Sequence, residues 1–250
     1  MSRTIRSFNR YELKYILDHD FALEVMKRLE DYMEPDQHGD AYGNYHLASL
    51  YYDTDDYRFY WEKVEGIRFR RKLRIRLYEK AEKLTPDTKV FVEIKQRLDR
   101  VTQKRRILLP YGAALRFCSE QKLEQYTSEE KETVDEMLHM MKTYQLKPQC
   151  ITSYKRRAFN GTQHDPGLRV TFDTNLRYRN VDLDLHSKKI GKFILGPDQC
   201  IMEVKVNDRI PYWLTEFVAD HNIRLMRISK YCASLEQAEA VPRREYEFAA

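Results

Sequence analysis

Basic side chains recur at a spacing of two in the segment IRFRRKLRIRLYE, residues 67–79. Every even position from 68 to 76 is basic, whereas most odd positions are apolar. A period of two is that of a β-strand, whose successive side chains point to opposite faces. The segment therefore predicts a strand with one cationic face. Arginine binds phosphate oxygens in a planar two-pronged manner and lysine binds them as a point charge, so this face suits a polyvalent anion.

Four further segments place charged side chains two residues apart. The pairs are Glu12 and Lys14, Glu93 and Lys95, Lys104 and Arg106, and Glu203 and Lys205. A glutamate set among bases can hold a divalent cation while the bases hold its phosphates. In the simpler interpretation the charged faces point to solvent, where they discourage aggregation of strand edges. Because like charges so close together repel one another, we favour a bound anion, and a phosphate chain fits best.

About eight strands and several helices must position these side chains. The expected strands span 7–16, 45–52, 67–79, 89–97, 102–109, 148–159, 168–176 and 199–206. The expected helices span 19–33, 54–65, 111–117, 128–144, 211–221 and 229–240. No Gly- or Pro-rich linker divides residues 1–250, which predicts one domain. We expect an α+β fold: a closed antiparallel β-barrel of about eight strands that forms a tunnel, with helices packed outside and the charged strand faces inside.

The composition excludes several other classes of protein. The 250 residues carry a net charge of +5, have a mean hydropathy of −0.73 and contain no apolar run that could span a bilayer. The N-terminus lacks the apolar region of a signal peptide, and the eight Gly form no Rossmann or P-loop motif. The four Cys form no C-x-x-C pair and the seven His do not cluster near them, which predicts a reduced, cytoplasmic protein without a zinc site.

Nine short motifs, taken in order, resemble the VTC domain, the polyphosphate polymerase domain of the vacuolar transporter chaperone complex. They are RYELKY (10–15), SLYYDT (49–54), KLRIRLY (72–78), VFVEIKQ (90–96), QKRRILL (103–109), YKRRAF (154–159), LRVTFDT (168–174), IMEVKV (201–206) and SKY (229–231). Each motif is weak alone, but their common order is specific and covers nearly the whole chain. The VTC domain belongs to the CYTH-like triphosphate tunnel metalloenzymes, so the resemblance implies a closed barrel with its active site inside.

The resemblance also implies roles for individual residues. The expected bases that hold the triphosphate and the growing chain are Lys14, Arg74, Arg76, Lys95, Lys104, Arg156 and Arg169. Five of them form the expected ATP-binding set: Arg74, Arg76, Lys95, Arg156 and Arg169. Glu203 is the expected ligand of a catalytic Mn²⁺ or Mg²⁺ ion, and Lys230 a further catalytic, phosphate-contacting lysine. Arg106 and Lys205 are weaker candidates for the lining.

One departure from the superfamily pattern bears on the reaction. Many tunnel triphosphatases begin with E-x-E-x-K, whereas Arg10 takes the place of the first Glu, ahead of Glu12 and Lys14. The lost carboxylate favours a polymerase that transfers the terminal phosphate of ATP to a polyphosphate chain. A triphosphatase or polyphosphatase of the same fold and a non-catalytic polyphosphate-binding module stay open as alternatives. We expect no nucleic-acid partner, and the chain resembles the stand-alone prokaryotic form, without a membrane span or an SPX domain.

Overall fold

A computed structural model describes residues 11–78, 83–99, 101–207 and 209–241. The strands are β1 (Tyr11–Asp18), β2 (Met33–Pro35), β3 (Asn44–Asp53), β4 (Phe69–Leu77), β5 (Lys89–Leu98), β6 (Val101–Pro110), β7 (Lys147–Gly161), β8 (Arg169–Arg179), β9 (Lys192–Phe193) and β10 (Gln199–Val206). The helices are α1 (His19–Leu29), α2 (Arg58–Val64), α3 (Tyr111–Glu120), α4 (Lys131–Tyr144), α5 (Tyr212–Asp220) and α6 (Lys230–Gln237). Residues 7–10 of the first expected strand lie outside the described residues.

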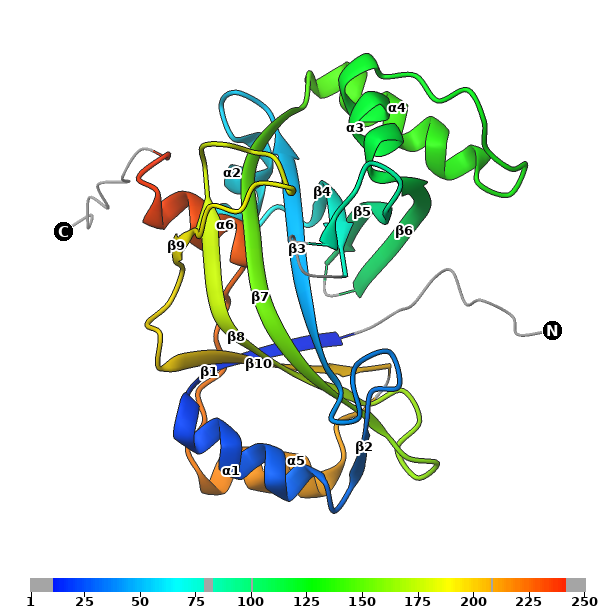
Figure 1. Cartoon of the computed structure of the whole chain (residues 1–250). Coiled ribbons are helices and arrows are strands. Elements are labelled where there is room, and N and C mark those ends of the chain that lie inside the picture. The colour runs from blue at the N-terminus through cyan, green and yellow to red at the C-terminus, as the bar shows by residue number, and fades with distance from the viewer. Residues whose placement is uncertain (1–10, 79–82, 100, 208, 242–250) are drawn as a thin grey trace.

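The main strands form one antiparallel sheet in the order β1-β10-β8-β7-β3-β4-β5-β6 (Figure 1). Two very short strands pair alongside this path, β2 with β7 and β9 with β8. The eight expected strands are therefore confirmed in type and approximate position. The two additional strands have three and two residues, too few for a period of two to be recognisable in the sequence.

The prediction of a closed barrel is wrong, because the sheet is curled but not closed. In the part of the chain that the structure describes, β1 and β6 are the two end strands and do not pair with each other. Register shifts at Tyr51/Tyr52 and at Ser153/Lys155 mark irregularities in β3 and β7, and such bulges bend a sheet. Alternating charges show which face turns inward, but they do not show whether two edges exchange backbone hydrogen bonds. Charged side chains are also a common means of leaving a strand edge unpaired.

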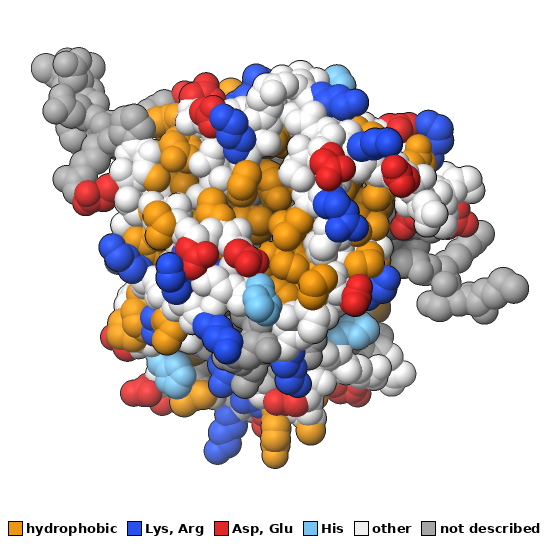
Figure 2. Space-filling model, turned by 45° about the horizontal axis from the view of Figure 1, so that its top comes forward, with side chains coloured by type: hydrophobic (Ala, Val, Ile, Leu, Met, Phe, Trp, Pro, Cys, Tyr) orange, Lys and Arg blue, Asp and Glu red, His pale blue; other side chains and the backbone are white. Residues whose placement is uncertain are grey.

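The face of the molecule seen in Figure 2 mixes both signs of charge. On this face, Lys and Arg side chains alternate with Asp, Glu and apolar side chains, without a continuous basic area. No helix among the described residues has the length and apolar character needed to cross a membrane.

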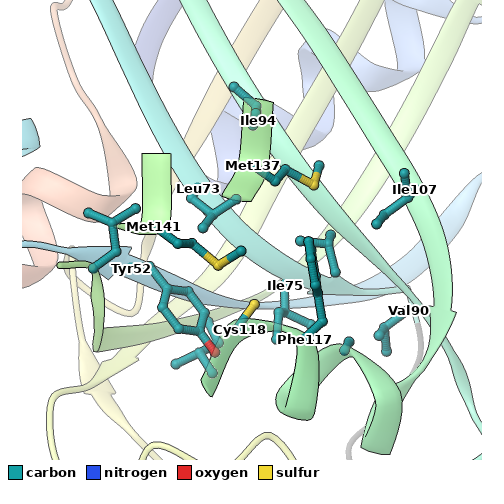
Figure 3. Packing of buried hydrophobic residues seen from close by; sticks show 14 of the residues in the cluster. Tyr52, Leu73, Ile75, Val90, Ile94, Ile107, Phe117, Cys118, Met137 and Met141 are labelled. Atoms are coloured by element: carbon teal, nitrogen blue, oxygen red, sulfur yellow. The ribbon is translucent and has the colours of Figure 1, made fainter. Parts of the chain in front are cut away.

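Helices cover the apolar outer face of the sheet in two places. Helices α3 and α4 pack on β4, β5 and β6, where Leu73, Ile75 and Ile94 meet Phe117 and Met137 (Figure 3). A second cluster joins α1 and α5 to β1, β8 and β10. The expected arrangement of apolar strand faces under helices is thus confirmed for these four helices. The charged faces of the same strands therefore point toward the inside of the curled sheet.

Helix α6 packs on the inner face, contrary to the expectation that the helices pack outside. Tyr231 of α6 lies 5.1 Å from the ring of Tyr51 on β3, and its hydroxyl donates to Asp53 at 2.5 Å. Ser229 caps the helix by accepting a hydrogen bond from the backbone N–H of Cys232. Because α6 carries an apolar stripe like any surface helix, its sequence does not reveal which face of the sheet it covers.

Candidate functional site

The inner face gathers basic side chains from seven strands and from α6. The structure places there all nine expected site residues: Lys14, Arg74, Arg76, Lys95, Lys104, Arg156, Arg169, Glu203 and Lys230. The two weaker candidates, Arg106 and Lys205, join them. Arg74, Arg76 and Arg156 are each 7% exposed, and Glu203 is 4% exposed. Such burial contradicts the interpretation in which these strand faces point to solvent.

Glu93 anchors the bases of β4 and β6. Its Oε2 accepts hydrogen bonds from Arg74 at 2.7 and 2.9 Å, and its Oε1 lies 3.5 Å from Lys104 and 4.0 Å from Arg106. Burial alone would raise the pKa of Glu93, but the charges of Arg74, Arg76 and Lys104 outweigh it and lower the pKa to about 2. Glu93 is therefore ionised and holds the basic side chains in place.

Asp173, on β8, anchors a second group of basic side chains. Arg156 donates to its two carboxylate oxygens at 2.6 and 2.7 Å, and Lys230 of α6 lies 2.5 Å away. Burial would raise the pKa of Asp173, but Arg156 and Lys230 lower it to about 2. The SKY motif thus contributes its lysine from the helix that packs inside the curl.

Glu203 lies among bases from three elements. Its side chain is 3.1 Å from Lys205, 3.4 Å from Lys14 and 3.6 Å from Arg156. Burial would raise the pKa of Glu203, but the charges of Lys205, Lys14, Lys230 and Lys95 hold it well below its usual value. Glu203 is therefore ionised and is surrounded by basic side chains.

Ion pairing also spans the gap between the two ends of the sheet. Lys95 of β5 donates to both carboxylate oxygens of Glu12 on β1, at 2.7 and 3.0 Å. We call this gap between β1 and β6 the seam. Side chains, and not a backbone ladder, thus hold the seam together over the described residues.

Arg76 differs from the other buried bases because its hydrogen-bond partners are neutral. It donates to the Ser49 hydroxyl at 3.1 Å and to the Tyr154 hydroxyl at 3.0 Å. Within the described ranges, no carboxylate forms an ion pair with it. A buried guanidinium without an anionic partner is strongly disfavoured unless a ligand supplies the negative charge. Arg76 is therefore the position where the inner face most needs an anion.

Arg169 occupies the periphery of the site. Its guanidinium bonds to Asp36 and donates to Asn160 and Tyr45, both at 2.9 Å. It contacts none of the carboxylates that organise the other bases. Of the nine expected residues, Arg169 is thus the one that the structure connects least closely to the rest.

Sequence reasoning missed the carboxylates that hold the bases. Glu93 belongs to an expected charged pair with Lys95 but not to the expected site residues, and neither does Asp173. Asp173 faces Arg156 across β7 and β8, and alternation along a single strand does not reveal such a pairing. Lys72 was also missed; its ammonium donates to the Ser229 hydroxyl at 2.9 Å.

The carboxylates present fit a divalent cation only if phosphate supplies further ligands. No group of three or more His, Cys, Asp or Glu in the described part of the chain could hold a metal ion. Glu203 offers hard oxygen donors, and the lowered pKa of Glu12 reflects Lys95 and other nearby bases. Mg²⁺ is commonly held by one or two carboxylates together with substrate phosphates. The donor set therefore suits an ion that arrives with a phosphate ligand.

Solved structures of low sequence identity align with most of this chain, and the TM-score of the first one below indicates a shared fold. A Bacillus halodurans protein described as a "putative adenylate cyclase" aligns over 90% of this chain and 96% of its own, with 12% identity and a TM-score of 0.54. A protein from Pyrococcus horikoshii OT3 aligns over 91% and 99%, with 11% identity and a TM-score of 0.45. A Vibrio parahaemolyticus protein, also described as a "putative adenylate cyclase", aligns over 90% and 97%, with 14% identity and a TM-score of 0.45.

Sequence comparisons give the family. A comparison with curated proteins gave no match. The model of the VTC domain matches residues 9–239, which include every expected site residue. The motifs that suggested this resemblance thus form part of a match over almost the full length, and the chain belongs to the VTC domain family.

Proposed function

We propose that this protein transfers the terminal phosphate of ATP to the end of a polyphosphate chain on the inner face of its sheet. The observation that carries the proposal is the buried set of bases that exceeds its carboxylate partners, with Arg76 as the clearest case. Membership in the VTC domain family, whose resemblance implied this activity, supports the same reaction.

The basic side chains would do most of the catalytic work. Phosphoryl transfer depends mainly on positioning and on neutralising the charge of the transferred phosphoryl group. Arg74 and Arg156 are pre-oriented by Glu93 and Asp173 and can each bind phosphate oxygens with their remaining N–H groups. Lys14 and Lys205, held near Glu203, can move to phosphate oxygens without crossing the site.

The carboxylates of the inner face favour a phosphate acceptor over water. Neighbouring bases lower the pKa of Glu12, Glu93, Asp173 and Glu203 despite their burial. A carboxylate whose pKa is lowered in this way is a weak proton acceptor near neutral pH, so these four side chains are poorly suited to activate a water molecule. The terminal phosphate of a polyphosphate chain is already an anion and needs no general base.

A divalent ion would be held by Glu203, with Glu12 nearby, and would supply additional charge neutralisation at the phosphate oxygens. Around that position, Lys14 and Lys205 would bind the other phosphate oxygens. Arg156 connects this region to Asp173 and Lys230, so the bases of both walls would act on one ligand.

One incubation tests the proposal. The full chain is mixed with ATP and MnCl₂, and the products are separated on a gel stained for polyphosphate. A ladder accompanied by ADP is the expected result. Orthophosphate without a ladder would instead identify a hydrolase, and retained polyphosphate binding without turnover would identify a binding module.

A variant of Glu203 tests whether this residue holds the divalent ion. Glu203→Gln should reduce turnover by at least about a hundredfold and leave the fold intact, since the amide cannot serve as an anionic ligand for the ion. Glu132→Gln, on the exposed side of α4, is the matched control and should retain full activity. Normal turnover of Glu203→Gln would show that Glu203 does not hold the ion.

A further inference from the structure

The two ends of the wall formed by β4 and β5 have different chemistry. At one end, which we call the aromatic end, lie Tyr45, Tyr78 and Phe91. Tyr78 packs edge-on against Phe91 with a centroid distance of 5.7 Å and lies 6.2 Å from Tyr45. Tyr78 is 38% exposed, so part of its ring is free to contact a ligand.

Two bases accompany these rings. The guanidinium of Arg106 lies 4.1 Å from the centre of Phe91, and that of Arg76 lies 5.7 Å from the centre of Tyr78. Aromatic rings flanked by guanidinium groups are the surfaces on which proteins stack nucleobases, because every base has a π-face. The aromatic end thus combines a stacking surface with Arg76, a buried base that forms no ion pair with a carboxylate of the described residues.

The other end, which we call the arginine end, is almost purely cationic. Lys72, Lys95 and Lys104 lie directly opposite one another on β4, β5 and β6. One step further out, Arg70 faces Arg97 in the same way. Like charges directly opposite on a sheet destabilise it. Burial and the facing charge of Arg97 lower the pKa of Arg70, which reflects this repulsion.

Few acids compensate these charges. Lys95 pairs with Glu12 and Lys104 approaches Glu93, whereas Lys72 bonds to a neutral hydroxyl. No carboxylate among the described residues forms an ion pair with Arg70 or Arg97. Two successive rows of facing bases therefore form a path that suits a flexible chain of repeated negative charges.

We propose that the base of ATP stacks at the aromatic end and that the polyphosphate chain extends past the arginine end. This inference rests on the proposed function, and it assigns a direction to the site. The bases between the two ends, with Arg74 at their centre, hold the phosphates where the reaction occurs.

The chemistry of the transfer requires the two ligands to lie on opposite sides. An oxygen of the acceptor's terminal phosphate forms a bond to the γ-phosphorus of ATP. The bond from that phosphorus to the β–γ bridging oxygen breaks, and its electron pair leaves with ADP. The attacking and leaving oxygens are roughly in line. If the nucleoside occupies the aromatic end, the acceptor chain must approach from the arginine end.

A pocket behind α6 is the competing position for the base. It has a volume of about 280 Å³ and is lined by Ile194, Leu195, Met226 and Cys232 among others. No aromatic ring lines it. Residues 226–229 form part of its wall, and Ser229 in that segment accepts the bond from Lys72. A base in this pocket would lie on the side of the lysine row and would reverse the direction that we propose.

Calorimetric titrations separate the contributions of the nucleoside and of the phosphates. Wild type and Tyr78→Ala are titrated with β,γ-imido-ATP and with tripolyphosphate, neither of which requires turnover. Loss of one stacking contact should weaken binding of the nucleotide about tenfold and leave tripolyphosphate binding unchanged. Tyr212→Ala removes an exposed tyrosine from α5 on the outside and should alter neither affinity. Thermal melting confirms that both variants fold.

The arginine end is tested with long-chain polyphosphate. The double variant Arg70→Ala/Arg97→Ala should bind long chains at least tenfold more weakly and bind tripolyphosphate and β,γ-imido-ATP as wild type does. Arg116→Ala/Lys142→Ala removes the same charge from exposed positions of α3 and α4 and should bind all three ligands normally.

Each other outcome overturns a defined part of the inference. Equal weakening of nucleotide and tripolyphosphate by Tyr78→Ala, or no weakening, would show that the aromatic end does not hold the base. Weaker nucleotide binding by the double variant Arg70→Ala/Arg97→Ala would show that the nucleotide base lies at the arginine end, opposite to our proposal. Failure of wild type to bind tripolyphosphate would overturn the proposed function as well. The variants could also show the expected affinities although the wild-type protein makes no polyphosphate ladder. That result would support the proposed orientation of the two ligands and would contradict only the polymerase activity.

Discussion

At the scale of single residues, Arg76 is the most informative position in the site. It is buried, and its partners are the hydroxyls of Ser49 and Tyr154. Arg76→Gln leaves no carboxylate unpaired, so the protein should fold normally. Tripolyphosphate affinity should fall about 10- to 100-fold, because a hydrogen bond to a charged group contributes about 1.5–3 kcal/mol. Titration calorimetry measures the affinity, and Arg116→Gln, on the exposed side of α3, is the control. An unchanged tripolyphosphate affinity of Arg76→Gln would mean that the inner face binds no phosphate.

Lys205 should couple anion binding to proton uptake. Burial lowers its pKa to about 7, and Arg156 and Lys95 act in the same direction, although Glu203 and Glu12 oppose them. Lys205 is therefore charged below pH 7 and mostly neutral at pH 8. A bound phosphate favours the charged form, so at pH 8 binding should take up a proton, which appears as a dependence of the calorimetric enthalpy on the buffer.

The matched variant for this experiment is Lys205→Arg, which stays charged at both pH values. Its enthalpy at pH 8 should depend less on the buffer than that of wild type, and the two should agree at pH 6. Protons released or taken up by the phosphate ligand itself are common to both proteins and cancel in the comparison. Identical proton uptake at pH 8 would place Lys205 outside the binding site.

The bases of the site were predictable from the sequence, but their partners were not. Alternation identifies Arg74, Arg76 and Lys95 because a strand face is a local property. The pairing of Arg156 with Asp173, or of Lys95 with Glu12, depends on which strands become neighbours across the curl. One-dimensional spacing contains no information of that kind.

At the scale of elements, α6 shows the limit of the sequence most clearly. Its position and approximate length were predicted, yet it lies inside the curl and not on the outer surface. The contact that fixes it joins two buried polar groups, the Tyr231 hydroxyl and Asp53, which also accepts the backbone N–H groups of Phe59 and Tyr60. Burial raises the pKa of both side chains.

Removal of that hydroxyl should loosen α6. Tyr231→Phe is expected to lower the free energy of unfolding by about 1–3 kcal/mol, because the buried carboxylate of Asp53 loses one of its hydrogen-bond donors. Urea denaturation of Tyr231→Phe and of Tyr212→Phe makes the comparison, since Tyr212 is 78% exposed and its hydroxyl should contribute little. Equal stability of the two variants would show that Asp53 does not hold the helix.

At the scale of the whole molecule, the net charge of +5 conceals a separation of charge. The visible outer face mixes both signs (Figure 2), whereas the inner face concentrates bases. An inner face whose charges repel one another should be stabilised by the ligand that neutralises them. Tripolyphosphate at about 100 times its dissociation constant should stabilise the fold by about 2.7 kcal/mol, which corresponds to a rise in Tm of about 5–10 °C.

Thermal melting with tripolyphosphate, and with sulfate at equal ionic strength, measures this stabilisation. The effect of tripolyphosphate should diminish as salt is added, since screening weakens the interaction of charges. Double-stranded DNA should have no comparable effect, because the bases of the inner face such as Arg74 and Arg156 are buried. Equal stabilisation by DNA and by tripolyphosphate would indicate an exposed basic surface and would contradict the enclosed site.

The seam between β1 and β6 has a consequence for how a long polymer is handled. A ring closed by backbone hydrogen bonds encircles its polymer, which can then escape only by sliding off at one end. Over the residues described, the curled sheet is instead open along the seam, and the Glu12–Lys95 ion pair bridges the opening. That ion pair can open and re-form while every backbone hydrogen bond of the sheet stays intact. If the inner face binds polyphosphate as we propose, a chain could then enter and leave through this opening as well as at the two ends of the curled sheet.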